Sequence, residues 1–74
     1  MNTDHLVHMA NRIGEFFQAM PDRSEAMAGI ATHLKRFWAP RMRHELAAHV
    51  DQHGGQGLMP LVLDALTLHR AVLD

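Results

Sequence analysis

Apolar residues recur at intervals of three and four along most of the chain, a spacing that places them on one side of an α-helix. Two such stretches cover residues 4–20 and 23–39, and a third with a narrower stripe covers residues 40–53. Residues 60–73 carry more apolar side chains than one narrow face holds, so this segment needs covering on two sides. No alternating strand pattern is visible. The pattern predicts a single all-α domain over residues 1–74, a small bundle of three main helices plus a shorter C-terminal helix.

Capping and proline residues set the expected helix boundaries. Thr3 is the expected N-cap of the first helix, and Pro21 ends that helix because proline disfavours helical geometry in the residue before it. Asp22 and Glu25 have the spacing of a capping box for the second helix. Pro40 fits the first turn of the third helix, where its missing N–H leaves no bond unmade. A kink at Pro40 within one long helix is the alternative.

The glycines fall into two groups. Gly54, Gly55 and Gly57 form a flexible break of the kind found at helix C-termini. Gly14 and Gly29 instead lie inside the first two helices, where each costs about 1 kcal/mol relative to alanine. A close crossing of these two helices would explain both residues, and the alternative is that each is a tolerated weak point.

Composition limits the chemistry that the chain can perform. The 74 residues include no cysteine, which removes disulfides, thiolate metal sites and cysteine nucleophiles together. A chain this short buries only about 60% of its unfolded surface, so its core is marginal and association with another protein would help it. No apolar run approaches the ~20 residues needed to cross a bilayer, and the first residues lack a signal-peptide pattern. We therefore expect a cytoplasmic protein that does not bind membranes.

The seven histidines are the most unusual feature of the composition. His49 and His53 would share one helix face, as a metal site requires, and a metal carrier is one hypothesis for the chain. However, position 50 is not the glutamate of zinc proteases, and His53 beside Gly54 can bond free helix-end carbonyls without a metal. His33 has no serine, cysteine or carboxylate pair at the spacing of a triad or dyad. We expect no catalytic, cofactor-binding or metal-ligating residue.

A basic and aromatic cluster surrounds the single tryptophan. Interleaved basic and aromatic residues can bind single-stranded nucleic acid, but they are also typical of protein-binding hot spots. Phe37 and Trp38 are adjacent, so on a helix they point about 100° apart. One of them is then expected inside while the other faces a neighbouring helix or a partner, although both could belong to the core. The basic members of the cluster are Lys35, Arg36, Arg41, Arg43 and His44.

Several motifs along the chain resemble one family. They are Met9-Ala10-Asn11-Arg12-Ile13-Gly14 followed by Phe16-Phe17, then His33 with Phe37-Trp38-Ala39-Pro40-Arg41-Met42-Arg43, then Leu58 and Pro60-Leu61 with Ala65-Leu66. This chain resembles the delta subunit of soluble, NAD-dependent, molybdenum-containing formate dehydrogenases of bacteria. The likeness runs from about Leu6 to Leu66. Ala39 departs from the family pattern, because an acidic residue that would cap the third helix often stands there.

The resemblance implies a noncatalytic accessory subunit that docks on the large catalytic subunit of formate dehydrogenase and supports its assembly, stability or cofactor loading. Molybdopterin guanine dinucleotide and iron-sulfur clusters are expected in that large subunit, FMN and the NAD site in other subunits, and no cofactor in this chain. Trp38 is expected to fill an apolar pocket of the partner, with arginines pairing at its edge. The alternative is a small nucleic-acid-binding or regulatory domain that uses residues 35–44. The expected partner-binding residues are Phe37, Trp38, Pro40, Arg41, Met42 and Arg43.

Overall fold

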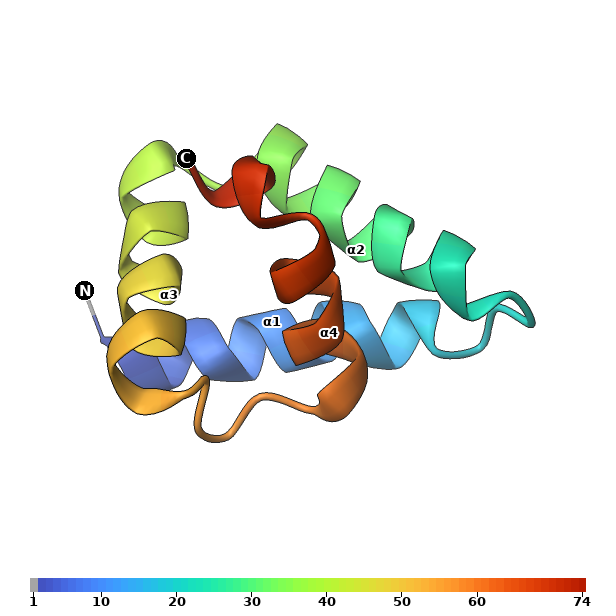
Figure 1. Cartoon of the computed structure of the whole chain (residues 1–74), viewed down its shortest axis with the longest axis horizontal. Coiled ribbons are helices and arrows are strands. Elements are labelled where there is room, and N and C mark those ends of the chain that lie inside the picture. The colour runs from blue at the N-terminus through green and yellow to red at the C-terminus, as the bar shows by residue number, and fades with distance from the viewer. Residues whose placement is uncertain (1) are drawn as a thin grey trace.

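The computed structural model describes residues 2–74, which form four α-helices and one short 3-10 helix without any strand (Figure 1). The all-α prediction of three main helices and a shorter C-terminal one is confirmed. The elements are α1 (Thr3–Phe17), α2 (Arg23–Phe37), α3 (Pro40–His53), α4 (Pro60–Leu68) and the 3-10 helix η1 (Arg70–Leu73).

The C-terminal elements fill the space between the three longer helices. In Figure 1, α3 stands at one end of α1, α2 runs back above α1, and α4 with η1 lies in the middle. α4 contacts both α1 and α2, while η1 contacts α2 and α3. Residues 60–73 are therefore covered on more than one side, as their excess of apolar side chains predicted. The fully buried large side chains are Leu6, Ile30, Leu34, Leu46, Val62, Leu66 and Leu73.

The first helix begins and ends differently from the prediction. Asn2 is its N-cap, because the Asn2 side chain accepts a hydrogen bond from the backbone N–H of Asp4 at 2.8 Å. Thr3, the expected cap, already lies in the helix and donates its hydroxyl to Glu45 of α3 at 3.1 Å. α1 ends at Phe17, so residues 18–20 form a turn and the expected end at residue 20 is wrong.

The junction between α2 and α3 is a sharp turn. Asp22 caps α2 as predicted, accepting from the backbone N–H of Glu25 at 3.2 Å. α2 ends at Phe37 and not at residue 39, because Trp38 and Ala39 are extended, with ψ of 138° and 149°. Pro40 is therefore the first residue of a separate helix, and the alternative of one kinked helix is wrong.

The last predicted helix is interrupted. His69, with φ −111° and ψ 44°, ends α4 after Leu68, and the chain continues as η1, so one helix over residues 60–73 is wrong. Gly54 caps α3 in the left-handed conformation with φ 64°, as the glycine pattern predicted. Asn11 of α1 then fixes the loop before α4. Its side chain donates to the carbonyl of Gly57 at 2.9 Å and accepts from the N–H of Met59 at 2.9 Å.

The two helical glycines face different neighbours. A Cβ at Gly14 would meet Val62 and, at 2.7 Å, the sulfur of Met59, so Gly14 allows α1 to approach the α4 segment. A Cβ at Gly29 would meet the ring of Phe17, whose Cδ1 would lie 2.7 Å away. Gly29 therefore permits the contact between α2 and α1. The idea that one crossing of α1 with α2 explains both residues is wrong for Gly14.

Candidate functional site

The six residues predicted to bind a partner lie at and just after the end of α2, and the structure separates them by burial. Trp38 is 6% exposed and belongs to the hydrophobic core, whereas the Phe37 side chain beside it is 69% exposed. Trp38 is already outside the helix, so the extended backbone at this residue turns its ring inward. Pro40 and Arg41 are exposed, and Met42 is partly buried against the core.

Arg43 of α3 is 7% exposed and holds three carbonyl groups of its own chain. Nη1 donates to the carbonyl oxygens of Trp38 at 2.7 Å and Lys35 at 3.3 Å, and Nη2 donates to that of Asp74 at 3.3 Å. Carbonyls in the last turn of a helix have no partner within the helix, so Arg43 supplies donors to the end of α2 from another element. The same guanidinium ties the C-terminus to this junction, and the two lie side by side in Figure 1.

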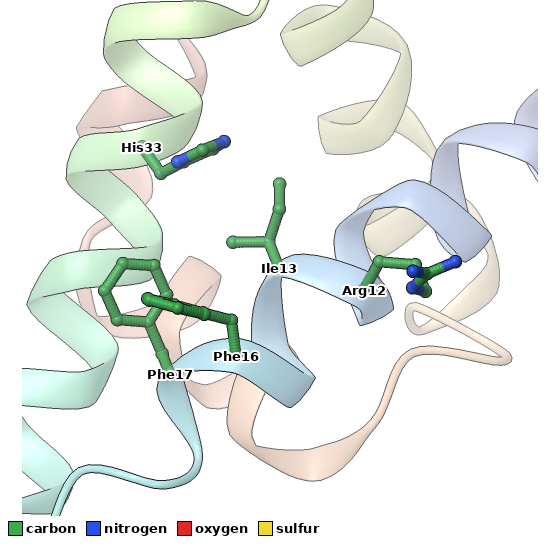
Figure 2. A pocket seen from close by; sticks show the side chains of 5 residues that line it. All are labelled: Arg12, Ile13, Phe16, Phe17 and His33. Carbon is green, nitrogen blue, oxygen red and sulfur yellow. The ribbon is translucent and has the colours of Figure 1, made fainter.

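An apolar hollow lies between the C-terminal half of α1 and the facing side of α2 (Figure 2). Figure 2 shows Phe16 and Phe17 together at the end of α1, across from His33 on α2, with Ile13 pointing into the space between them. A second hollow shares Phe17 and His33 with the first and continues along α2 to Phe37. We call the two together the aromatic groove. Its lining residues are Arg12, Ile13, Phe16, Phe17, Ala28, Gly29, Thr32, His33, Arg36 and Phe37.

The rings of the groove are arranged in contacting pairs. Phe16 and Phe17 meet edge to face with centroids 5.1 Å apart, and His33 and Phe37 meet at 4.8 Å. Ile13 and Phe17 pack against the core and form the floor. Phe16 is 74% exposed and Phe37 is 69% exposed, so the two outer rings keep most of their apolar surface in water. They line two hollows that share Phe17 and His33, and a continuous apolar surface left in solvent is typical of binding sites.

The charged residues along the groove are all basic. Arg12 lines one hollow and Arg36 the other, and the guanidinium carbon of Arg36 lies 6.0 Å from the centroid of Phe37. Among the lining residues none is acidic, although the carboxylate of Glu15 lies 3.9 Å from Nε of Arg12. Both partners of this pair are more than half exposed, so it stabilises little. The groove is therefore an apolar surface with a positive edge.

Sequence reasoning found Phe37 but missed the α1 side of the groove. The helical spacing over residues 4–20 accounts for Phe16 and Phe17 as part of an apolar stripe, and it predicts no role for Arg12. The signal was present, because Phe16 and Phe17 are adjacent like Phe37 and Trp38 and cannot both fill one narrow stripe. What the sequence did not contain was the packing of α1 against α2, which places Phe16 and Phe37 along one groove.

The histidines are distributed over the surface. His49 and His53 of α3 have ring centroids 5.8 Å apart, and Nε2 of His49 lies 2.7 Å from the carbonyl oxygen of Gln56. This contact joins the end of α3 to the glycine loop. Within residues 2–74 no three histidine or acidic side chains gather in the way that a metal ion requires. No helix in the same range has the length and apolar character to cross a membrane.

Comparison with known proteins assigns the chain to a family. A family model described as FdsD, the NADH-dependent formate dehydrogenase delta subunit, matches residues 5–66. No curated protein and no solved structure matches the chain. The match spans most of α1, all of α2 and α3 and most of α4, and so contains both walls of the aromatic groove and the α2–α3 junction. It confirms the resemblance seen in the sequence motifs: the chain belongs to the FdsD family of formate dehydrogenase delta subunits.

Proposed function

We propose that this protein is a noncatalytic accessory subunit that docks on the large catalytic subunit of an NAD-dependent formate dehydrogenase and supports its assembly, stability or cofactor loading. The observation that carries the proposal is the pair of exposed rings, Phe16 and Phe37, along a groove in a chain of the delta-subunit family. Burying an exposed phenylalanine contributes about 1.5–3 kcal/mol, so two such rings form an effective anchor.

The six predicted partner-binding residues have different roles in this proposal. Phe37, Pro40 and Arg41 are exposed and are available for direct contact, and Met42 presents part of its side chain. Trp38 and Arg43 are buried and would act by holding the end of α2, and with it Phe37, in place. Direct contact by Trp38 would require the core to open. The docking surface therefore combines the exposed members of this segment with the aromatic groove.

The redox chemistry is assigned to the partner subunits in this proposal. The large subunit would hold molybdopterin guanine dinucleotide and iron-sulfur clusters, and other subunits FMN and the NAD site. The chain itself offers no cysteine for cluster ligation, and its glycine-rich loop, residues 54–57, follows a helix, whereas phosphate-binding loops follow a strand. This chain would contribute a docking surface and the free energy of its binding to the large subunit. In this proposal it lies in the cytoplasm with the rest of the complex.

The test is an affinity purification of the tagged chain from extracts of its native host at moderate salt. We expect recovery of the large molybdenum-containing subunit together with formate-dependent NAD reduction. The variant Phe37→Ala/Arg41→Ala should lose both, and the matched variant Gln52→Ala, altered at an exposed α3 residue outside the groove, should keep both. If nucleic acid is recovered instead and is released steeply by salt, the alternative use of residues 35–44 is correct and the docking proposal is wrong.

A further inference from the structure

We infer that the aromatic groove receives an amphipathic helix of the partner subunit whose apolar stripe is flanked by carboxylates. This inference rests on the proposed function, since it takes for granted that the chain docks on another subunit. It adds the surface and the chemistry of the segment that is bound. The three supporting observations are the helical walls of the groove, the position of its apolar rings and the sign of its charges.

The walls of the groove favour a helix over an extended segment. Both are α-helices, α1 and α2, whose backbone N–H and C=O groups along the groove are used within each helix. An extended segment would find no sheet edge here and would leave its own backbone groups unpaired as it was buried. A helix satisfies its backbone internally and needs only side-chain contacts. The chemistry of the walls therefore selects a helical segment as the occupant.

The position of the rings specifies an apolar stripe. Ile13 and Phe17 form a floor that already packs on the core, and Phe16 and Phe37 stand at the two hollows with most of their surface in solvent. Apolar side chains at the spacing i, i+3, i+4 and i+7 of an incoming helix would lie along this line of rings. Such contact would remove both outer rings from water. The uncharged polar residue Thr32 lines one of the two hollows, and His33 lines both.

The charges specify acidic flanks. Arg12 lines one hollow of the groove and Arg36 the other, and α2 has no aspartate or glutamate from Ala26 to Phe37. Glu15 on α1 lies 3.9 Å from Arg12, but both side chains of this pair are more than half exposed and Glu15 does not line the groove. Carboxylates beside the apolar stripe of the partner helix would meet these guanidinium groups. A second copy of this chain is a poorer occupant, because face-to-face contact would bring the basic edges of two grooves together. The charge pattern thus selects an acidic partner segment over self-association.

The experiment uses the full chain and the formate dehydrogenase complex isolated from a host that lacks this subunit. A photoreactive phenylalanine analogue replaces Phe16 in one protein and Gln52 in another, and the crosslinked peptides are sequenced by mass spectrometry. In parallel, the affinity for the same complex is measured for Arg12→Glu/Arg36→Glu. The matched control is Lys35→Glu, which reverses an exposed charge on α2 that does not line the groove.

We expect the analogue at position 16 to crosslink to one helical segment of the partner that is rich in apolar and acidic residues. The analogue at position 52 should not crosslink to that segment. The double charge reversal should weaken binding at least about tenfold, against about threefold or less for the Lys35 control. Two outcomes would overturn the inference while leaving the docking proposal intact. In the first, the chain binds the complex but crosslinks form only from position 52. In the second, position 16 crosslinks to a basic or an extended segment. Crosslinking to a second copy would also overturn it. Failure of the unmodified chain to bind the complex would refute the proposed function itself.

Discussion

Where α2 ends, two neighbouring aromatic residues each contact an arginine, and the two aromatic–arginine pairs lie in opposite environments. Trp38 is buried in the core and its carbonyl accepts from the buried Arg43, whereas Phe37 is exposed and lies under the exposed Arg36. The same residue types thus build the fold on one side of the chain and a surface on the other. Composition alone does not distinguish a binding surface from a core. The path of the backbone between Phe37 and Pro40 decides which aromatic side chain is buried.

The largest expected effect is the difference in stability between two single variants, in which one or the other of the neighbouring aromatic residues is replaced by alanine. Trp38→Ala should cost about 3–5 kcal/mol of unfolding free energy, because a large ring leaves a cavity in a small core. Phe37→Ala should change stability by less than about 0.5 kcal/mol. Urea unfolding followed by circular dichroism measures both. Equal losses in the two variants would mean that the contrast between a buried and an exposed neighbour is wrong.

The two arginines of the same segment offer the second comparison. Arg43→Ala should lower the free energy of unfolding by about 2–3 kcal/mol, because the carbonyls of Lys35 and Trp38 lose a charged hydrogen-bond donor at the end of α2. Arg41→Ala should lose almost nothing, since Arg41 is exposed. The stability of Arg43→Lys should lie between those of the two alanine variants, because a single ammonium group cannot reproduce the several directed N–H donors of a guanidinium. The same unfolding assay checks the order, and a stable Arg43→Ala variant would count against the structural role of this residue.

The two helical glycines test whether the groove can change while the fold stays intact. Gly14→Ala should destabilise the protein by about 1–2 kcal/mol, because Val62 is fully buried and cannot give way. Gly29→Ala should be nearly neutral, because Phe17 is only partly buried and its ring can move while the helix gains propensity. That movement should instead alter binding to the enzyme. A larger stability loss at Gly29 than at Gly14 would contradict this account.

The smallest effect is expected at an ion pair on the surface. Arg70 donates to both carboxylate oxygens of Asp51 at 2.6 and 2.8 Å, and these hydrogen bonds hold the pKa of Asp51 below its ordinary value. A lowered carboxyl pKa adds stability that is present above the unfolded pKa and is lost as the pH falls through the folded one. The contribution should therefore fade below about pH 4. Thermal unfolding from pH 7 to 3 should show a slightly smaller acid loss for Asp51→Asn than for the wild type, and an identical profile would show that the pair contributes nothing.

The helices could be predicted from the sequence because their signals are local. Asp22 caps α2 with its side chain, while Pro40 starts α3 and Gly54 ends it through their backbone geometry, and each signal acts within a few residues. The division of Phe37 and Trp38 between surface and core was anticipated only as one of two alternatives. Its outcome depends on the extended backbone at Trp38, which no helical periodicity describes.

The rest of the candidate site depends on contacts between distant parts of the chain. Arg43 was expected on the docking surface, but it is buried because it reaches the end of α2 and the carbonyl of Asp74. Phe16 belongs to the candidate site only because α1 packs against α2 and the two helices line one groove. Gly14 faces α4 because the final helix folds back between α1 and α2. Periodicity assigns each residue to a face of its own helix and does not say which element covers that face.

The most direct test of the central claim measures stability and affinity on the same samples of Phe16→Ala/Phe37→Ala. Both rings are exposed, so we predict an unfolding free energy within about 1 kcal/mol of the wild type. Affinity for the formate dehydrogenase complex lacking this subunit should fall by about a hundredfold or more, as expected for two anchoring rings. A folded double variant that binds as tightly as the wild type would contradict the claim that these rings form the docking surface.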